Sequence, residues 1–189
     1  MAAKKKFGNY DRALEYYEKG LVIKLKTLGG EHPSVATSYN NIGMVWKIKD
    51  EFDKALEYYE KNLAIKLKTF GELHPDVATS YNNIGMLWKS KDEFDKALEY
   101  YEKSLAIDLK TLGGEHSDVA TSYNNIGMVW KSKGDYDKAL EYLILSSEIR
   151  FKNLGANHKS TKTTIGNAKL IAKSLGKENE LPGWMKSAG

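Results

Sequence analysis

The sequence predicts an all-α protein in which pairs of antiparallel helices repeat along the chain and stack side by side as a solenoid. The first reason is an internal repeat: Pro75 follows Pro33 by 42 residues, and 33–74 aligns with 75–116 without gaps. The second reason is the helical spacing of the apolar residues inside each repeat. A period of this length is typical of units that have no core of their own and depend on their neighbours.

The repeat also predicts how the chain is divided. We expect a partial N-terminal repeat with only a second helix at 1–32, complete repeats at 33–74, 75–116 and 117–158, a C-terminal capping helix at 159–175 and a tail at 176–189. The repeat at 117–158 follows the pattern of the other two and drifts after Tyr142. Each complete repeat should therefore contribute two helices joined by a short connection.

The first helix of each repeat is predicted from its apolar stripe, which in the first complete repeat is Ala36, Tyr39, Gly43 and Trp46, with Ile42 beside it. Pro33 suits the first helical turn, where its missing N–H would have no partner in any case. The helix should end near Asp50. Asp50 and Asp92 stand where the third repeat has Gly134, so we expect the left-handed conformation at all three positions.

The second helix is predicted to run from an N-cap at Asp53 to about Thr69, with Phe52 just before the cap. Its apolar stripe is Ala55, Leu56, Tyr59, Leu63 and Leu67. Glycine inside a helix costs about 1 kcal/mol relative to alanine. The recurrence of a glycine at Gly43, Gly85 and Gly127 therefore indicates close contact with the small Ala55, Ala97 and Ala139, and Trp46 should be buried beside it.

These residues carry a resemblance to a known family. Tyr39, Ile42, Gly43, Trp46, Ala55 and Tyr59 have the spacing of the tetratricopeptide repeat signature, which recurs at 81–101 and 123–139, with Leu143 replacing the last aromatic residue. The 42-residue length and the run His-Pro-x-Val-Ala-x-x-Tyr-Asn-Asn-Ile-Gly resemble the variant found in kinesin light chains. The resemblance covers Gly8 to about Leu175. It implies a right-handed superhelix, a concave groove that is lined by the first helices and takes extended peptides, and no catalytic activity.

A helical wheel places a second face on each first helix, opposite the apolar stripe. Thr37 and Ile48 lie on this face in the first complete repeat. The predicted peptide-binding residues are Asn40, Asn41, Met44 and Lys47, then Asn82, Asn83, Met86 and Lys89, then Asn124, Asn125, Met128 and Lys131. An amide carries both donors and an acceptor, so a row of amides can pair with the backbone of an extended peptide. The kinesin light chain resemblance implies this clamp for the second asparagine of each pair.

Methionine offers adaptable apolar contact on this face, and the lysines would favour an acidic ligand. Other interpretations stay open at this point. Each asparagine could instead satisfy a neighbouring helix, and the lysines could form an ordinary solvated face. A structural or self-assembling scaffold without a specific ligand, natural or engineered, would explain why the repeats are nearly identical. RNA binding is a lesser alternative, because no continuous basic stripe emerges.

The sequence predicts no enzyme, cofactor or metal site. His32, His74, His116 and His158 recur at the repeat period, but equivalent residues of stacked helices are roughly 10–20 Å apart, whereas zinc binds nitrogen at about 2 Å. A loop or capping role is expected for them. The net charge of +4 is mild, and the chain has no cysteine. With no apolar run long enough for a membrane span, we expect a cytoplasmic protein that binds a protein or peptide.

The two ends of the chain lead to separate expectations. The helix from Tyr10 to Leu28 lacks a first helix before it, so its side with Leu14, Tyr17 and Leu21 should be uncovered. We therefore expect either a fragment of a longer array or homo-oligomerisation through this end. The C-terminal helix is polar, as a capping helix should be. Trp184 follows Glu178 and Glu180 in the tail, and it is expected to pack at the terminus or to be disordered, with occupation of the groove as an alternative.

Overall fold

The computed structural model describes the backbone of residues 2–187 and the side chains from Asn9 onward, and this part of the chain folds into helices and contains no strand. It forms two compact parts, residues 1–92 and 93–189, which we call the N-terminal half and the C-terminal half. Within residues 2–187, none of the helices combines the length and the apolar composition that a bilayer-crossing segment needs.

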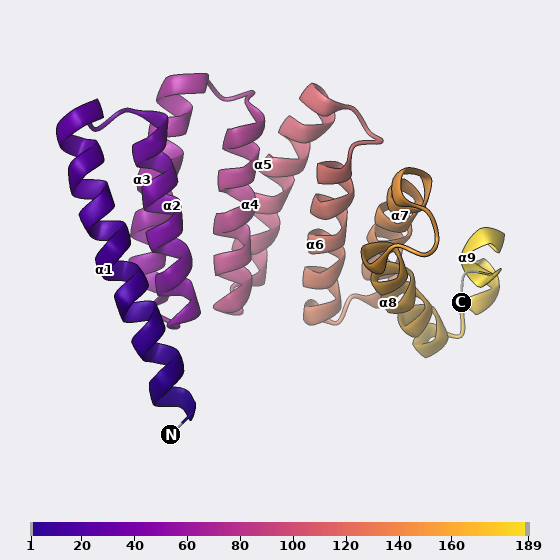
Figure 1. Cartoon of the computed structure of the whole chain (residues 1–189). Helices are drawn as coiled ribbons and strands as arrows, with labels where there is room; N and C mark the ends of the chain where they lie inside the picture. Colours follow the sequence, from indigo (N-terminus) through magenta and orange to yellow (C-terminus); the bar gives the residue numbers. More distant parts are fainter. Residues whose placement is uncertain (1, 188–189) are drawn as a thin grey trace. The chain divides into compact units, whose positions relative to one another are not determined.

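The N-terminal half consists of α1 (Ala2–Leu28), α2 (Pro33–Ile48), α3 (Phe52–Phe70) and α4 (Pro75–Ser90), which run up and down beside one another (Figure 1). Helix α2 packs against both α1 and α3, and α3 packs against α4. The core between α1, α2 and α3 contains Val35, Ala36, Ile42 and Val45, all of which are buried. Helix pairs thus share their cores with their neighbours, as the repeat predicts.

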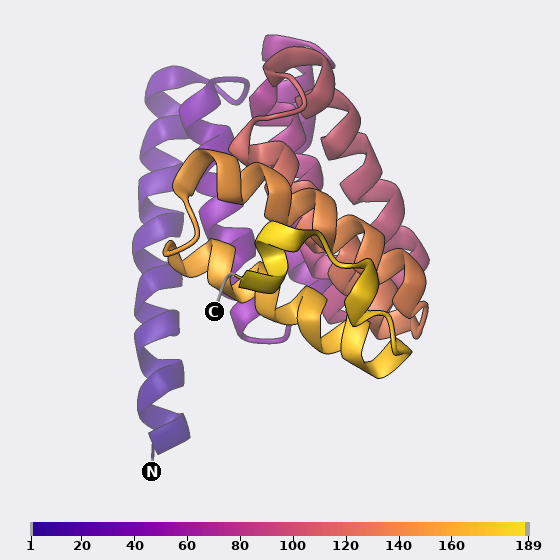
Figure 2. The ribbon, with the colours of Figure 1, turned by 90° about the vertical axis from the view of Figure 1, so that its right-hand side faces the viewer.

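The C-terminal half consists of α5 (Phe94–Leu112), α6 (Ser117–Lys133), α7 (Tyr136–Leu154) and α8 (Lys159–Leu175), followed by the 3-10 turn η1 (Glu178–Glu180) and α9 (Gly183–Ser187). Helix α6 packs against α5 and α7, and α7 packs against α8. The tail folds across α7 and α8 (Figure 2). Leu181 and Met185 are buried there, and the ring of Trp184 lies 4.6 Å from that of Phe151. Of the alternatives predicted for Trp184, packing at the terminus is therefore the one that the structure has.

The four repeated histidines are N-caps, which confirms the capping prediction. In each case the imidazole Nδ1 accepts a hydrogen bond from the backbone N–H two residues later, at 3.1 to 3.3 Å. The capped helices are α2, α4, α6 and α8, whose N-caps are His32, His74, His116 and His158. This bond satisfies one of the N–H groups that the first turn of a helix leaves without a partner.

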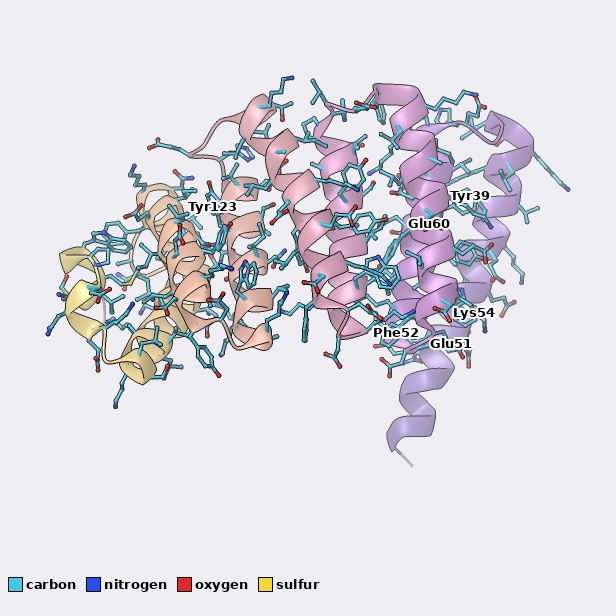
Figure 3. The ribbon with its side chains drawn as sticks, turned by 180° about the vertical axis from the view of Figure 1, so that it is seen from behind. Tyr39, Glu51, Phe52, Lys54, Glu60 and Tyr123 are labelled. Carbon is cyan, nitrogen blue, oxygen red and sulfur yellow. The ribbon has the colours of Figure 1, made fainter. Side chains whose placement is uncertain are left out.

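The predicted start of the second helices is wrong by two residues. Helix α3 begins at Phe52, its N-cap is Glu51, and no side chain caps it. The reason is the preceding turn: Asp50 has a φ of 59° and Asp92 a φ of 57°, the left-handed conformation that was expected, and the chain re-enters a helix directly after one further residue. Asp53 lies in the first turn and forms a 2.7 Å ion pair with Lys91 instead. Figure 3 shows Glu51 and Phe52 at this end of α3.

Gly43 makes the close contact with Ala55 that its recurrence predicted, and a further close contact with Tyr59. A Cβ at Gly43 would lie 3.2 Å from the backbone oxygen of Ala55 and 2.9 Å from Cδ1 of Tyr59. The glycine therefore accommodates the ring of Tyr59 as well as the backbone at Ala55. Trp46, expected to be buried, is only half-buried. The ammonium groups of Lys49 and Lys54 lie 4.9 and 4.4 Å from the centre of its ring.

The prediction for α1 is wrong for two of its three residues. Leu14 and Leu21 are buried, because they pack into the core with α2, whereas Tyr17 is exposed as predicted. The exposed apolar residues lie elsewhere on the helix: Tyr16 is 65% exposed and Ile23 is 62% exposed. Tyr16 and Ile23 correspond to Tyr58 and Ile65, 42 residues later, which pack into the core around α2. The open side of α1 is thus the one that would face a first helix of its own repeat.

Candidate functional site

The N-terminal half contains a pocket on the face that carries the predicted peptide-binding residues. It has a volume of about 200 Å³ and is lined by Asn40, Met44, Lys47, Ile48, Tyr59, Asn83 and Met86. These residues come from α2, α3 and α4, so the pocket exists because neighbouring first helices present the same face side by side. Predicted site residues of two successive repeats therefore meet at one place.

Two of the predicted amides are hydrogen-bonded to each other across this pocket. Nδ2 of Asn83 donates to Oδ1 of Asn40 at 2.9 Å, between α4 and α2. Both side chains are half-buried. The bond uses one of the two amide protons of Asn83 and one lone pair of the Asn40 oxygen. It therefore orients the two amides and leaves each of them with further hydrogen-bonding capacity toward a ligand.

The methionines of this face are exposed apolar groups, as is Ile48, which is 43% exposed. Met44 is 44% exposed and Met86 is 40% exposed. Nδ2 of Asn82 lies 3.8 Å from the sulfur of Met86, one helical turn further along α4. Because a thioether side chain is flexible and polarisable, it can adapt to ligand groups of different shapes.

The lysines give the pocket a positive edge. Lys47 is half-buried, and burial together with the nearby charge of Lys89 lowers the pKa of its ammonium group. Both causes act because two cations stand near each other on a partly desolvated surface. A carboxylate or another anion placed beside Lys47 would relieve this repulsion.

The third predicted row lies on α6 in the C-terminal half, and α8 partly covers it. Oγ1 of Thr164 donates to Oδ1 of Asn124 at 3.5 Å, and Nδ2 of Asn167 lies 3.8 Å from the sulfur of Met128. Met128 is half-buried, unlike its two equivalents. Asn125 and Lys131 are half-buried as well. The three rows are therefore equivalent in sequence but differ in their surroundings, because the neighbour of α6 is the capping helix α8.

Tyr59 lines the pocket, although the sequence analysis did not include it among the predicted peptide-binding residues. It is 4% exposed, and burial raises the pKa of its hydroxyl group to about 12. The sequence correctly placed it in the core stripe of the second helix. Its ring nonetheless reaches the pocket through the gap that Gly43 leaves. The sequence did contain one sign of this contact: Gly43, which has no Cβ, recurs together with an aromatic residue at Tyr59 in the following helix. Asn41 and Asn82 do not line the pocket, although both are half-buried.

The sequence matches family models described as tetratricopeptide repeat over residues 47–110, 86–150 and 3–34. Among solved structures, BtubC (BKLC) from P. vanneervenii has a TM-score of 0.82 and 25% identity, over 98% of this chain and 74% of that one. A putative kinesin light chain from Podosopora anserina, described as having nearly identical TPR-like repeats, has a TM-score of 0.75 and 24% identity, over 99% and 87%. The apo form of RapI gives 0.76 and 20%, over 94% and 62%. No curated protein matches the chain.

Proposed function

Because the chain belongs to the tetratricopeptide repeat family, with repeats like those of kinesin light chains, we propose that it binds an extended segment of a partner protein on the face of its first helices. Repeats of this family generally form protein–protein interaction modules, so a role in binding rather than in catalysis is the premise. The observation that carries the proposal is the pocket where amides and methionines of α2 and α4 come together.

The chemistry of this pocket defines the ligand that we propose. An extended peptide offers one N–H and one C=O per residue, and amide side chains can pair with both groups without reading the side chains of the ligand. Met44 and Met86 supply apolar contact area. The closeness of Lys47 and Lys89 favours a segment with acidic residues. The proposed partner is thus an acidic, unstructured peptide.

The test is a variant in which Asn41, Asn83 and Asn125 are all replaced by alanine. A hydrogen bond contributes about 0.5–1.5 kcal/mol, so the loss of three amides should weaken peptide binding at least tenfold. Binding can be measured on an array of acidic peptides, and the best binder can be titrated in solution. The melting temperature should fall only slightly, because the three side chains lie outside the apolar core and the lost bond from Asn83 to Asn40 contributes about 0.5–1.5 kcal/mol.

The matched control is Asn9→Ala, which removes an exposed amide from α1 and should bind as the unchanged protein does. Equal affinity of the triple variant and this control would contradict the amide clamp. If no peptide on the array binds the unchanged protein either, the groove proposal as a whole is rejected.

A second function, self-assembly, is favoured by the open side of α1. A shallow depression there is lined by Glu15, Glu18, Lys19, Val22 and Ile23. Tyr16 and Ile23 are the most exposed apolar residues among the described side chains of the helix. Single exposed apolar residues are common on protein surfaces, but a cluster on one helix face is typical of an interaction site. We propose that two copies associate through this side of α1.

Ile23→Glu should abolish this association, because it places a charge in the centre of the apolar cluster. We expect light scattering of the unchanged protein to show a mass that rises with concentration and the variant to remain a monomer. Leu170→Glu is the control: Leu170 is 66% exposed on α8 and should not matter. A monomeric unchanged protein at the highest concentration would refute the proposal.

A further inference from the structure

At one position of the second helices, a basic side chain in three of the four repeats forms a hydrogen bond to the next helix. Lys24, Lys66 and Arg150 are separated by multiples of 42 residues. In each case the side chain donates to the backbone carbonyl ten residues later, in the first turn of the next helix, at 3.1 to 3.3 Å; the acceptors are Ser34, Asp76 and Ser160. A cation suits this place, because it supplies donors to a carbonyl oxygen at the junction of two helices.

Asp108 occupies this position in the remaining repeat. It lies on α5, 42 residues after Lys66, and the residue is 4% exposed. The equivalent carbonyl acceptor belongs to Asp118, and an ionised carboxylate cannot donate to it. Its carboxylate instead accepts hydrogen bonds from Ser104 on its own helix and from Ser122 on α6, whose hydroxyl oxygen lies 3.5 Å from Oδ2 of Asp108. At two of the equivalent positions, by contrast, the basic side chain lies close to the corresponding hydroxyl group: Lys24 is 2.8 Å from Ser38 and Arg150 is 2.7 Å from Thr164.

We propose that Asp108 makes the junction between α5 and α6 sensitive to protons, so that the junction is tighter when this carboxyl group is protonated. A carboxylic acid carries one O–H donor. The protonated side chain can therefore donate to an oxygen of α6, as the equivalent basic residues donate to the next helix in the other repeats. Protonation also removes a buried negative charge, which is costly in a protein interior. The new hydrogen-bond donor and the loss of the buried charge both stabilise the junction when Asp108 is protonated.

The surroundings of Asp108 support this direction. Burial, and after it the negative charge of Asp118, raise the pKa of Asp108 to about 6. The hydroxyl groups of Ser122 and Ser104 and the imidazole of His116 act in the opposite direction but do not cancel the burial. Among the described residues of the C-terminal half, Asp118 and His116 are the charged or titratable groups that face it from α6 and its cap.

The sign of the pH effect follows from the two pKa values. The ordinary value for Asp108 is 3.8 and the value in the folded protein is about 6. The folded state therefore holds this proton more tightly than the unfolded state does. The stabilisation is fully present below pH 3.8 and is lost as the pH rises through 6. Over this window the unfolding equilibrium constant should rise by roughly tenfold to a hundredfold because of this group alone.

The test compares the unchanged full-length chain with Asp108→Asn, whose amide is neutral at every pH and can donate. Urea unfolding is followed by circular dichroism between pH 4.5 and 7.5. The stabilities of the two proteins should differ least at pH 4.5 and increasingly as the pH rises. At pH 7.5 the unfolding constant of the unchanged protein should be larger than that of Asp108→Asn by roughly tenfold to a hundredfold. Asp108→Lys, which restores the residue type of the siblings, should also be more stable than the unchanged protein at pH 7.5.

Asp95→Asn is the control, because Asp95 lies on the same helix with a side chain that is 88% exposed. It should follow the pH dependence of the unchanged protein. A direct readout is the carbon chemical shift of the Asp108 carboxyl group during a pH titration, with an expected midpoint near pH 6. A midpoint near 4, or parallel stability curves for the unchanged protein and Asp108→Asn, would overturn the proposal.

Discussion

Gly43→Val is expected to lower the free energy of unfolding by about 2–3 kcal/mol, because overpacking a tight helix contact usually costs about 1–3 kcal/mol. A Cβ at this position would stand 2.9 Å from Cδ1 and 3.0 Å from Cε1 of Tyr59, and 3.2 Å from the backbone oxygen of Ala55. The ring can shift only at the expense of the core and of the pocket that it lines, whereas the backbone oxygen cannot move without α3. The two methyl groups of valine extend the clash further.

The measurement is urea unfolding of the full-length chain, and the matched control is another helical glycine. Gly166 lies inside α8, and a Cβ there would meet no other atom within 4 Å. Gly166→Ala should therefore raise stability by about 0.5–1 kcal/mol, through the better helix propensity of alanine. Tyr59→Leu should cost less in the Gly43→Val protein than alone, because the two side chains compete for one space. If Gly43→Val is as stable as the unchanged protein, the result would contradict the close contact of Gly43 on α2 with α3.

Met185→Ala should cost about 3 kcal/mol, within the range of about 2–5 kcal/mol for methionine-to-alanine changes in cores. Met185 has an exposed fraction of 0% and packs with Leu181 against Leu140, Leu143 and Ile165. The tail thus covers an apolar surface of α7 and α8 that would otherwise face water, and its loss should destabilise the end of the array. Thermal unfolding measures the effect, and faster hydrogen exchange in α8 should accompany it.

Met44→Ala is the control for this variant. Met44 is 44% exposed on α2, so its truncation should change stability by no more than about 0.5 kcal/mol. Equal effects of the two methionine variants would show that the tail does not act as a cap in solution. This experiment also tests whether the tail remains on α7 and α8 and away from the asparagine rows.

The parts of the site that the sequence predicted depend on local periodicity. The helical wheel placed Asn40, Met44 and Lys47 opposite the apolar stripe, and the same arithmetic applies to every repeat. The contact of Asn83 with Asn40 could not be derived in this way, because it depends on the distance and rotation between two helices. For the same reason the sequence did not anticipate that α8 would partly cover Asn124.

The sequence by itself determined the all-α repeat architecture, the left-handed turns at Asp50 and Asp92, and the capping role of the repeated histidines, because these follow from interactions within a few residues of the chain. Only the tertiary structure decided which side of α1 lies open, how the tail covers α8, and where Tyr59 meets the pocket. Each of these depends on which neighbour is present to bury a given face, and that is a property of packing between helices and not of any single segment.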